Sequence, residues 1–316
     1  MTAIPTPPVT CETVELPTRP TIVLHRSVLL ATDASPAAVA ATRVAAALAS
    51  RWRVTPNVCT VVPPPPVAID PAGAAIVYSP ALAEELRREV ARQLEASAPA
   101  AVRWPREVAV GAPAAEIVRI AAARGSDLIV LGLRPHAFLD RVFRDETALT
   151  VMRQATVPVL AVTPFMKPVA RRIAVAIDFS RASIAAARAA LTLLDDGGSL
   201  MLVYVEPPSE SRPADAEGFT AIYAQGVAAA FTRLRQELTA RANVRIESVV
   251  LHGGGVAPAL LSFARRAEID LLAVGSQRHS IARRAVVGSV TTALARAATC
   301  SLLVIPPGRR TPETRS

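Results

Sequence analysis

The stretch VLLATDAS at residues 28–35 returns as IAVAIDFS at residues 173–180, and this repetition decides how the chain is organised. Both copies run from a short apolar stretch into an aspartate, one further residue and a serine. Three more segments recur in the same order: GAPA at 111–114 loosely as GGVA at 254–257, DLIVLG at 127–132 as DLLAVG at 270–275, and ATVPVL at 155–160 as ATCSLL at 298–303. The sequence therefore contains two related halves.

The spacing between the copies indicates a duplicated domain. The three later pairs are each 143 residues apart (270 − 127, for example), and the first pair is 145 apart (178 − 33), a two-residue indel. Solenoid repeats have shorter periods, roughly 20–50 residues, and a chain of 316 residues suits two domains. We predict a proline-rich disordered arm at 1–20, a first domain at 21–165, a second at 169–308 and a tail at 309–316.

Composition narrows the class of protein. Hydrophobic residues make up 51% of the chain, yet charged residues interrupt every long apolar stretch, so we expect no membrane span. The N-terminus lacks the pattern of a signal peptide and the three cysteines are scattered, which predicts a cytoplasmic, reducing location. The net charge of +9 suits an anionic small ligand. Only 4% of residues are aromatic and the arginines occur in both halves, which disfavours nucleic acid as a partner.

Short β-type runs alternate with alanine-rich helical runs in each half. The expected strands are 28–32, 54–62, 101–110, 128–132 and 157–162, then 173–177, 200–205, 244–251, 271–275 and 302–305. The expected helices are 36–50, 80–97, 113–124 and 145–154, then 182–194, 217–242, 257–266 and 288–297. This alternation predicts an α/β fold of two tandem doubly wound domains, each a five-stranded parallel sheet flanked by helices. Ligands in such folds bind beyond the carboxyl ends of the strands.

The segment after the fourth strand of the second half is a candidate anion site. Gly275 ends that strand, and Gly288 and Ser289 open the next helix, whose free N–H groups and dipole attract negative charge. A missing side chain at Gly275 would let a ligand approach the backbone, and the Ser289 hydroxyl could bind a phosphate or a metal ion. In the alternative interpretation, Gly275 only forms a turn and Ser289 only caps the helix. Asp178 has the same two interpretations, ligand contact or cap of the following helix.

These motifs, in this order and twice over, resemble the universal stress protein family in its tandem two-domain form, across almost all of residues 21–308. The nucleotide motif of that family is Gly, two residues, Gly, nine residues, Gly, then Ser or Thr. Counted from Gly275, the third glycine falls at Gly288, followed by Ser289. The resemblance implies ATP, with or without Mg²⁺, in the second domain alone. The positions that would hold it are Ala176, Ile177, Asp178, Val205, Val274, Gly275, Arg278, Gly288, Ser289 and Val290.

Arg278 departs from the family pattern, because it stands where the second glycine is expected. If that glycine served a turn with positive φ, an arginine would strain it by roughly 1 kcal/mol. If it served close approach of the backbone, the side chain would block the phosphate. Alternatively, the guanidinium swings out and pairs with phosphate oxygens, as Arg283 and Arg284 also could. The sequence leaves these alternatives open, together with a third in which all three arginines are solvated.

The first half provides an internal control. The same count from Gly132 places Pro135 at the second position and Asp145 and Glu146 where Gly and Ser are expected. Carboxylates at a helix N-terminus would occupy the anion site, and two like charges at about 4 Å repel by roughly 4 kcal/mol at an effective dielectric near 20. We therefore predict that the first domain does not bind ATP through this loop.

No catalytic motif accompanies the candidate site. The sequence has no Gly-x-x-x-x-Gly-Lys-Ser/Thr loop and no Gly-x-Ser-x-Gly elbow. His136 and His279 occupy equivalent positions after the fourth strands, where solvated loop residues are the simpler interpretation. We predict a non-catalytic protein, in which slow incidental ATP hydrolysis is the only activity left open.

Two functional hypotheses follow. In the first, the protein is a stress-response sensor or regulator that binds an adenine nucleotide in its second domain. In the second, it is a scaffold of the same fold that binds no nucleotide and acts on a protein partner. The family resemblance also implies that the fifth strands of the two domains, 157–162 and 302–305, pair within one chain and hide each other's edges. A further homodimer stays open.

Overall fold

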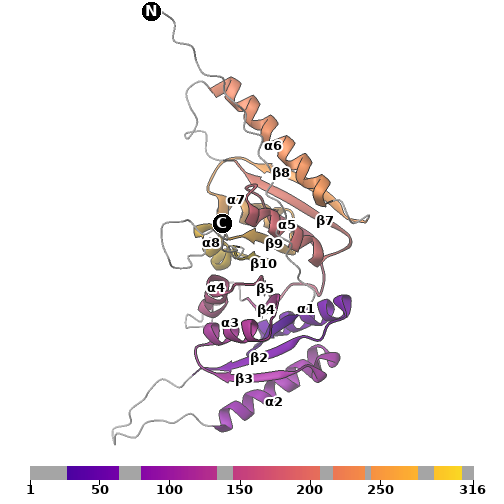
Figure 1. The fold of residues 1–316 in the computed structure, drawn as a ribbon, viewed down its shortest axis with the longest axis vertical. Coiled ribbons are helices and arrows are strands. Elements are labelled where there is room, and N and C mark those ends of the chain that lie inside the picture. Colours follow the sequence, from indigo (N-terminus) through magenta and orange to yellow (C-terminus); the bar gives the residue numbers. More distant parts are fainter. Residues whose placement is uncertain are drawn as a thin grey trace, which may run out of the picture.

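The computed structural model describes residues 27–63, 80–133, 145–206, 216–238, 243–276 and 288–307 (Figure 1). The first half comprises β1 (Val28–Ala31), α1 (Pro36–Trp52), β2 (Asn57–Val62), α2 (Pro80–Ser97), the 3-10 helix η1 (Pro99–Arg103), β3 (Arg106–Val110), α3 (Pro113–Ala123), β4 (Leu128–Gly132), α4 (Asp145–Gln154) and β5 (Val159–Val162). The second half comprises β6 (Ala170–Ala176), α5 (Arg181–Leu193), β7 (Leu194–Val205), α6 (Ala216–Leu238), β8 (Arg245–Leu251), α7 (Val256–Arg266), β9 (Leu271–Gly275), α8 (Ser289–Ala297) and β10 (Ser301–Ile305).

The ten strands form one sheet in the order β3-β2-β1-β4-β5-β10-β9-β6-β7-β8. Within each half all pairs are parallel, and strand order reverses between β1 and β4 and again between β6 and β9. The halves join through β5 and β10, which pair antiparallel with Leu303 opposite Leu160. The predicted α/β class and the pairing of the fifth strands are both confirmed.

Helices cover both faces of the sheet, and each face has one hydrophobic core that runs through both halves. Helices α1, α2, α5 and α6 pack on one face, where buried residues from Val28 to Ile305 belong to a single cluster. Helices α3, α4, α7 and α8 pack on the other face, in a second cluster from Leu29 to Val304. The two halves therefore share their hydrophobic cores, and each buries apolar surface of the other.

Side-chain hydrogen bonds also cross the junction between the halves. The Thr163 N–H donates to Ser301 Oγ at 3.0 Å, and both residues are buried. The guanidinium of Arg51, at the end of α1, donates to the carbonyl of Leu194 at 2.8 Å, where α5 ends. Arg153 of α4 reaches Thr292 of α8 at 3.5 Å. These contacts supplement the apolar junction and fix its register.

The structure corrects several expected boundaries. The strand expected at 101–110 begins only at Arg106, because η1, opened by Pro99, occupies 99–103. The strand expected at 200–205 begins earlier, at Leu194, and its pairing with β6 is irregular, with a register shift between Ala170 and Arg172. Helix α6 is described as far as Leu238, and the expected end at 242 lies outside the described residues. The predicted arm at 1–20 and the tail at 309–316 lie outside the described residues.

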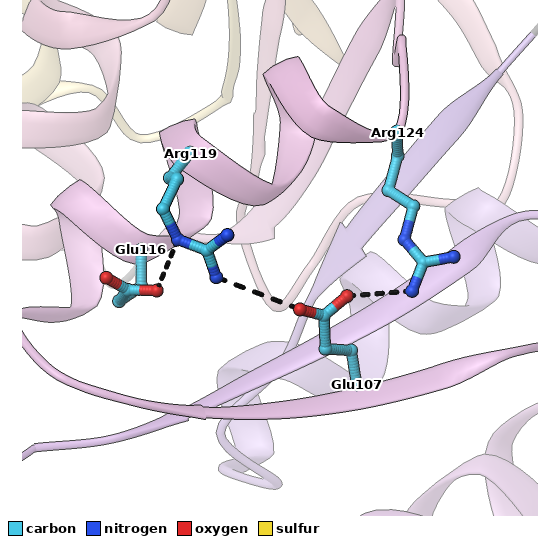
Figure 2. Close-up of polar contacts among 4 residues, drawn as sticks. All are labelled: Glu107, Glu116, Arg119 and Arg124. Carbon is cyan, nitrogen blue, oxygen red and sulfur yellow. Dashed lines mark hydrogen bonds and ion pairs between the residues drawn. The ribbon is translucent and has the colours of Figure 1, made fainter.

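Charged side chains on the edge strand β3 and on the neighbouring α3 region form a network of ion pairs. Glu107 on β3 pairs with both Arg119 and Arg124 of the α3 region, at 3.8 and 2.8 Å, and Arg119 also pairs with Glu116 at 2.8 Å (Figure 2). Exposed ion pairs stabilise a fold only weakly. Charged side chains on an edge strand do discourage pairing with the sheet of another molecule. No helix within the described part of the chain is long and apolar enough to cross a membrane.

Candidate functional site

The sequence-predicted residues of the second half gather at the carboxyl ends of β6, β7 and β9, beside the start of α8. Three of them, Ala176, Val205 and Val274, are at or near the ends of their strands and pack against the same hydrophobic cluster. Val290, in the first turn of α8, packs against that cluster too. This edge coincides with the reversal of strand order between β6 and β9, where ligands of doubly wound folds bind. Arg278 lies outside the described residues.

Asp178 organises the turn between β6 and α5. Its Oδ1 accepts a hydrogen bond from the Ser180 N–H at 3.0 Å, and Ser180 Oγ in turn accepts from the Ser183 N–H at 3.2 Å and caps α5. Partial desolvation raises the pKa of the Asp178 carboxyl, but hydrogen bonds from Ser180 and Ser183 outweigh it and hold that pKa below its usual value. Asp178 therefore acts as an ionised cap in the absence of any ligand.

The first half builds the same turn. Asp33 Oδ1 accepts from the Ser35 N–H at 2.9 Å, and Ala34 between them has a φ of 59°, as Phe179 has in the second half. A residue other than glycine in the left-handed region is uncommon, so its presence in both copies shows that the turn is demanded by the fold. The aspartate thus has a structural role in the turn before the helix, whose N-cap is the following serine, and a ligand role would be additional to it.

The structure gives Gly275 a role that neither sequence interpretation, ligand approach or turn, predicted. A Cβ at this position would lie 2.3 Å from the carbonyl carbon of Ala182 and 2.6 Å from the Ser183 nitrogen, so the space is filled by the first turn of α5. In the first half, a Cβ on Gly132 would lie 2.9 Å from the Ala37 backbone. The glycine is needed because a helix N-terminus packs directly on the strand end. It forms no turn, and it does not by itself indicate a ligand.

Gly288 has no such structural explanation. It is the N-cap of α8 with φ −53° and ψ 154°, a conformation open to any residue, and among the described residues no heavy atom lies within 4 Å of the Cβ it lacks. Its carbonyl accepts the Thr292 N–H at 3.1 Å. Ser289 is exposed at the first helical position, and no side chain of the described residues caps the helix. Among the residues that the structure describes, none covers the backbone at the start of α8.

The repeated fold and motif order match a known protein family. The universal stress protein family model matches residues 25–163 and again 170–306. The chain belongs to the universal stress protein family. It is similar to a universal stress protein from Archaeoglobus fulgidus DSM 4304, with 18% identity over 89% of this chain and 98% of that one and a TM-score of 0.63. A protein of unknown function from Pseudomonas aeruginosa PAO1 matches at 14% identity over 90% and 93%, with a TM-score of 0.57.

These structural similarities support the shared tandem fold and nothing finer. No significant match was found among curated proteins. The resemblance inferred from the repeated motifs is thus confirmed at the level of family and fold.

The two universal stress protein domains differ at the start of the last helix. In the second domain, the first turn of α8 contains no acidic residue. In the first domain, α4 starts at Asp145, with Glu146 directly after it. After β1 of the first domain, Thr32 Oγ1 donates to Gln93 of α2 at 2.7 Å, and Gln93 donates to the Ser35 carbonyl at 2.9 Å. The last helix of the first domain thus starts with two acidic residues, whereas the first turn of α8 has none.

A second polar cluster was missed by the sequence reasoning. Glu206, directly after β7, pairs with His252, directly after β8, with 2.5 Å between Oε2 and Nδ1. Beside them the hydroxyls of Tyr204 and Tyr223 are hydrogen-bonded, and Phe179 packs on the ring of Tyr204 at 5.7 Å between centroids. The sequence signal that could have revealed this cluster is a polar residue directly after each of two adjacent strands. Within the described residues no three metal-binding side chains gather in one place.

Proposed function

We propose that this protein is a cytoplasmic stress-response protein whose second domain binds an adenine nucleotide, with ATP as the reference ligand, and that it acts as a sensor or regulator without catalysis. The observation that carries the proposal is the contrast between Gly288 and Asp145 at equivalent helix starts. The fold explains the shared aspartate and Gly275, but it does not explain Gly288. The first turn of α8 has no acidic residue and no described side chain covers it, and such a helix N-terminus favours a phosphate group.

The arrangement of the remaining groups supports binding rather than a chemical step. His252, the one histidine within the described residues, follows β8, which lies three strand positions from β9. With strands about 4.8 Å apart, that is roughly 14 Å along the edge from the strand that leads to α8. A general base must come within roughly 3 Å of the group it acts on, so His252 is too far from the end of β9 to act on a ligand bound there. We therefore propose that the second domain recognises the nucleotide without a dedicated catalytic base among the described residues, and slow incidental hydrolysis stays open.

The first test is calorimetric titration of the full chain with ATP and Mg²⁺, together with mass spectrometry of small molecules released from the freshly purified protein. We expect one adenine nucleotide per chain. Gly288→Asp places the charge of the first domain at the start of α8, where repulsion of about 4 kcal/mol at an effective dielectric near 20 should weaken binding by at least about 100-fold.

The matched control is Ala112→Asp. It adds the same charge at the N-cap of α3, an exposed position in the first domain where the N-cap likewise lacks a side-chain bond. It should leave ATP binding unchanged. Full affinity in Gly288→Asp would defeat the site assignment, and no binding by the wild-type protein at millimolar ATP would favour the scaffold hypothesis.

A further inference from the structure

The two outer edges of the sheet carry different side chains. Strand β3 lies at one end of the strand order and β8 at the other (Figure 1). Glu107 of β3 lies opposite Cys59 of β2, and Val249 of β8 lies opposite Val203 of β7. Cys59 and Val203 are equivalent, since the carbonyl of each accepts the N–H of the residue directly after the first strand of its domain. Val249 therefore stands where the first domain has the carboxylate of its ion-pair network (Figure 2).

The charged partners of that carboxylate have no charged counterparts in the second domain. The two arginines of the network correspond, at the constant spacing of 143 residues, to Ser262 and Ala267. Strand β8 itself contains no charged residue from Ser248 to Leu251, and Val250 among them is 40% exposed. Charged side chains protect an edge strand from pairing with other chains. The second half of β8 therefore lacks the protection that β3 has.

Main-chain groups of β8 face away from the sheet. The Leu251 carbonyl accepts the Glu206 N–H at 2.8 Å, so the main-chain groups of Leu251 face β7. These groups point to opposite sides in successive residues of a strand, so those of Ile246, Ser248 and Val250 face outward. Among the residues that the structure describes, no strand pairs with them. Outward N–H and C=O groups at this spacing form hydrogen bonds with another strand.

The β8 edge matches a second copy of itself. In an antiparallel pair with a two-fold axis at Ser248, Ile246 of one copy lies opposite Val250 of the other. All three outward residues can then exchange N–H···O bonds across the axis. The two charged residues of β8 lie opposite Leu251 and Val249 in this register, so no like charges are directly opposed.

Helix α6, at the same end of the sheet, also lacks charge on its exposed residues. No residue of α6 between Glu217 and Arg233 is charged, and Ile222 there is 60% exposed. The corresponding helix of the first domain, α2, exposes charged residues such as Glu84 and Arg88. At the junction within the chain, β5 and β10 pair antiparallel, and the helices beside them are hydrogen-bonded across it. A second β8 would bring its own α6 to a junction of the same kind, where uncharged helix surfaces meet without desolvating charge.

We propose that the outer edge of β8 pairs antiparallel with β8 of a second copy of this chain, in a homodimer whose sheet is continuous across a two-fold axis. A strand satisfies the outward main-chain groups, and a second copy matches the edge in register and charge. An isologous contact closes after two copies, and the ion-paired β3 edges discourage further growth. This assembly goes beyond nucleotide binding and does not depend on it.

Sedimentation equilibrium of the full chain, up to about 100 µM, tests the proposal, and we expect a dimer. Val250→Pro removes an outward N–H and leaves the ladder with β7 intact, which is where a sheet tolerates proline. Each dimer loses two hydrogen bonds, so the dissociation constant of the dimer should rise by at least about 30-fold. Val250→Lys is the second variant, because it keeps the N–H and adds a charge opposite Ile246 of the second copy. It should raise the same constant by at least about 10-fold.

Val108→Pro is the matched control. The Gly111 N–H donates to the Val62 carbonyl at 3.1 Å, so the same alternation turns the N–H of Val108 outward from β3. This variant should keep the dissociation constant of the wild-type dimer. An equal loss of the dimer in this control would overturn the assignment to β8. So would a dimer that survives both changes at Val250 in protein with a native circular dichroism spectrum.

A monomeric wild-type protein would overturn the proposal as well. Hydrogen exchange at the amides of Ile246, Ser248 and Val250 then identifies the state of the edge. Protection in the monomer would show that another segment of the same chain pairs with β8, and rapid exchange would show an open edge. In the dimer we expect these three amides to be protected and to exchange faster on dilution.

Discussion

Replacing Gly275 with alanine should damage the second domain more than the equivalent change damages the first. The added Cβ would lie 2.3 Å from the Ala182 carbonyl carbon and 2.5 Å from its oxygen, both main-chain atoms of a helix start. Ordinary carbon–carbon contacts begin near 3.5 Å, so strand and helix would have to separate by roughly 1 Å. Both elements belong to a core in which residues such as Ile184 are fully buried, which leaves little room to yield.

Overpacking of this kind costs typically about 1–3 kcal/mol and occasionally more. We expect about 3 kcal/mol or more for Gly275→Ala, because the added Cβ would lie only 2.3 Å from main-chain atoms that cannot turn away. For Gly132→Ala the nearest main-chain atoms are at 2.9 Å, and about 1–2 kcal/mol is expected. Gly288→Ala meets no described atom within 4 Å and should change stability by less than about 0.5 kcal/mol.

Urea unfolding of the three variants provides the measurement. Far-ultraviolet circular dichroism follows the whole chain, whereas the fluorescence of Trp52 and Trp104, both in the first half, follows that half. In Gly275→Ala the circular dichroism transition should move to lower urea ahead of the fluorescence transition, or both should move together if the shared core couples the halves. The reasoning is refuted if Gly275→Ala unfolds within about 0.5 kcal/mol of wild type, or if Gly132→Ala is the more damaged variant.

Three further predictions concern single side chains. Ser126→Ala should be neutral or stabilising by up to about 1 kcal/mol in urea unfolding, because the buried Ser126 hydroxyl has no hydrogen-bond partner among the described residues; a clear loss of stability would contradict this. The pKa of Asp178 is lowered in the folded state, so its contribution is present above the unfolded pKa near 3.9 and is lost as pH falls through the folded pKa. Asp178→Asn should therefore cost more stability at pH 7 than at pH 2, and an equal cost at both would speak against an ionised carboxylate in this turn. Arg51→Ala should cost about 1–2 kcal/mol of unfolding free energy in urea, because it removes the donor to the Leu194 carbonyl. Arg43→Ala, on the exposed face of α1, should be near neutral in the same measurement.

The structure explains why some residues, such as Asp127 and Asp270, recur in both copies of the sequence repeat. Asp270 binds the N–H groups of Arg171 and Arg172 at 2.9 Å and so fastens the start of β6 to β9, and Asp127 accepts the Ser27 N–H at 3.3 Å. Such constraints act on neighbouring strands of every domain with this strand order. They recur in both halves, so the comparison of the copies exposed them.

The polar cluster and the reason for Gly275 were not predictable in the same way. Glu206 and His252 are 46 residues apart, and nothing in their local sequence sets their distance. They meet because β7 and β8 are parallel neighbours that end at the same edge. Likewise, Gly275 and Ala182 are distant in sequence, and the tight space between them exists only once α5 lies on the sheet. The loop with Arg278 lies outside the described residues, and its role stays a prediction.

The sequence by itself determined the duplication, the fold class, the family and the asymmetry between Gly288 and Asp145, because each depends on residue types at fixed spacing along the chain. Tertiary structure alone decided which of the repeated residues are needed for packing and which polar side chains share the edge with α8. The physical reason is that close approach and hydrogen bonding between strand ends depend on how the ten strands are ordered in space, and that order joins residues whose separation in sequence carries no information about contact.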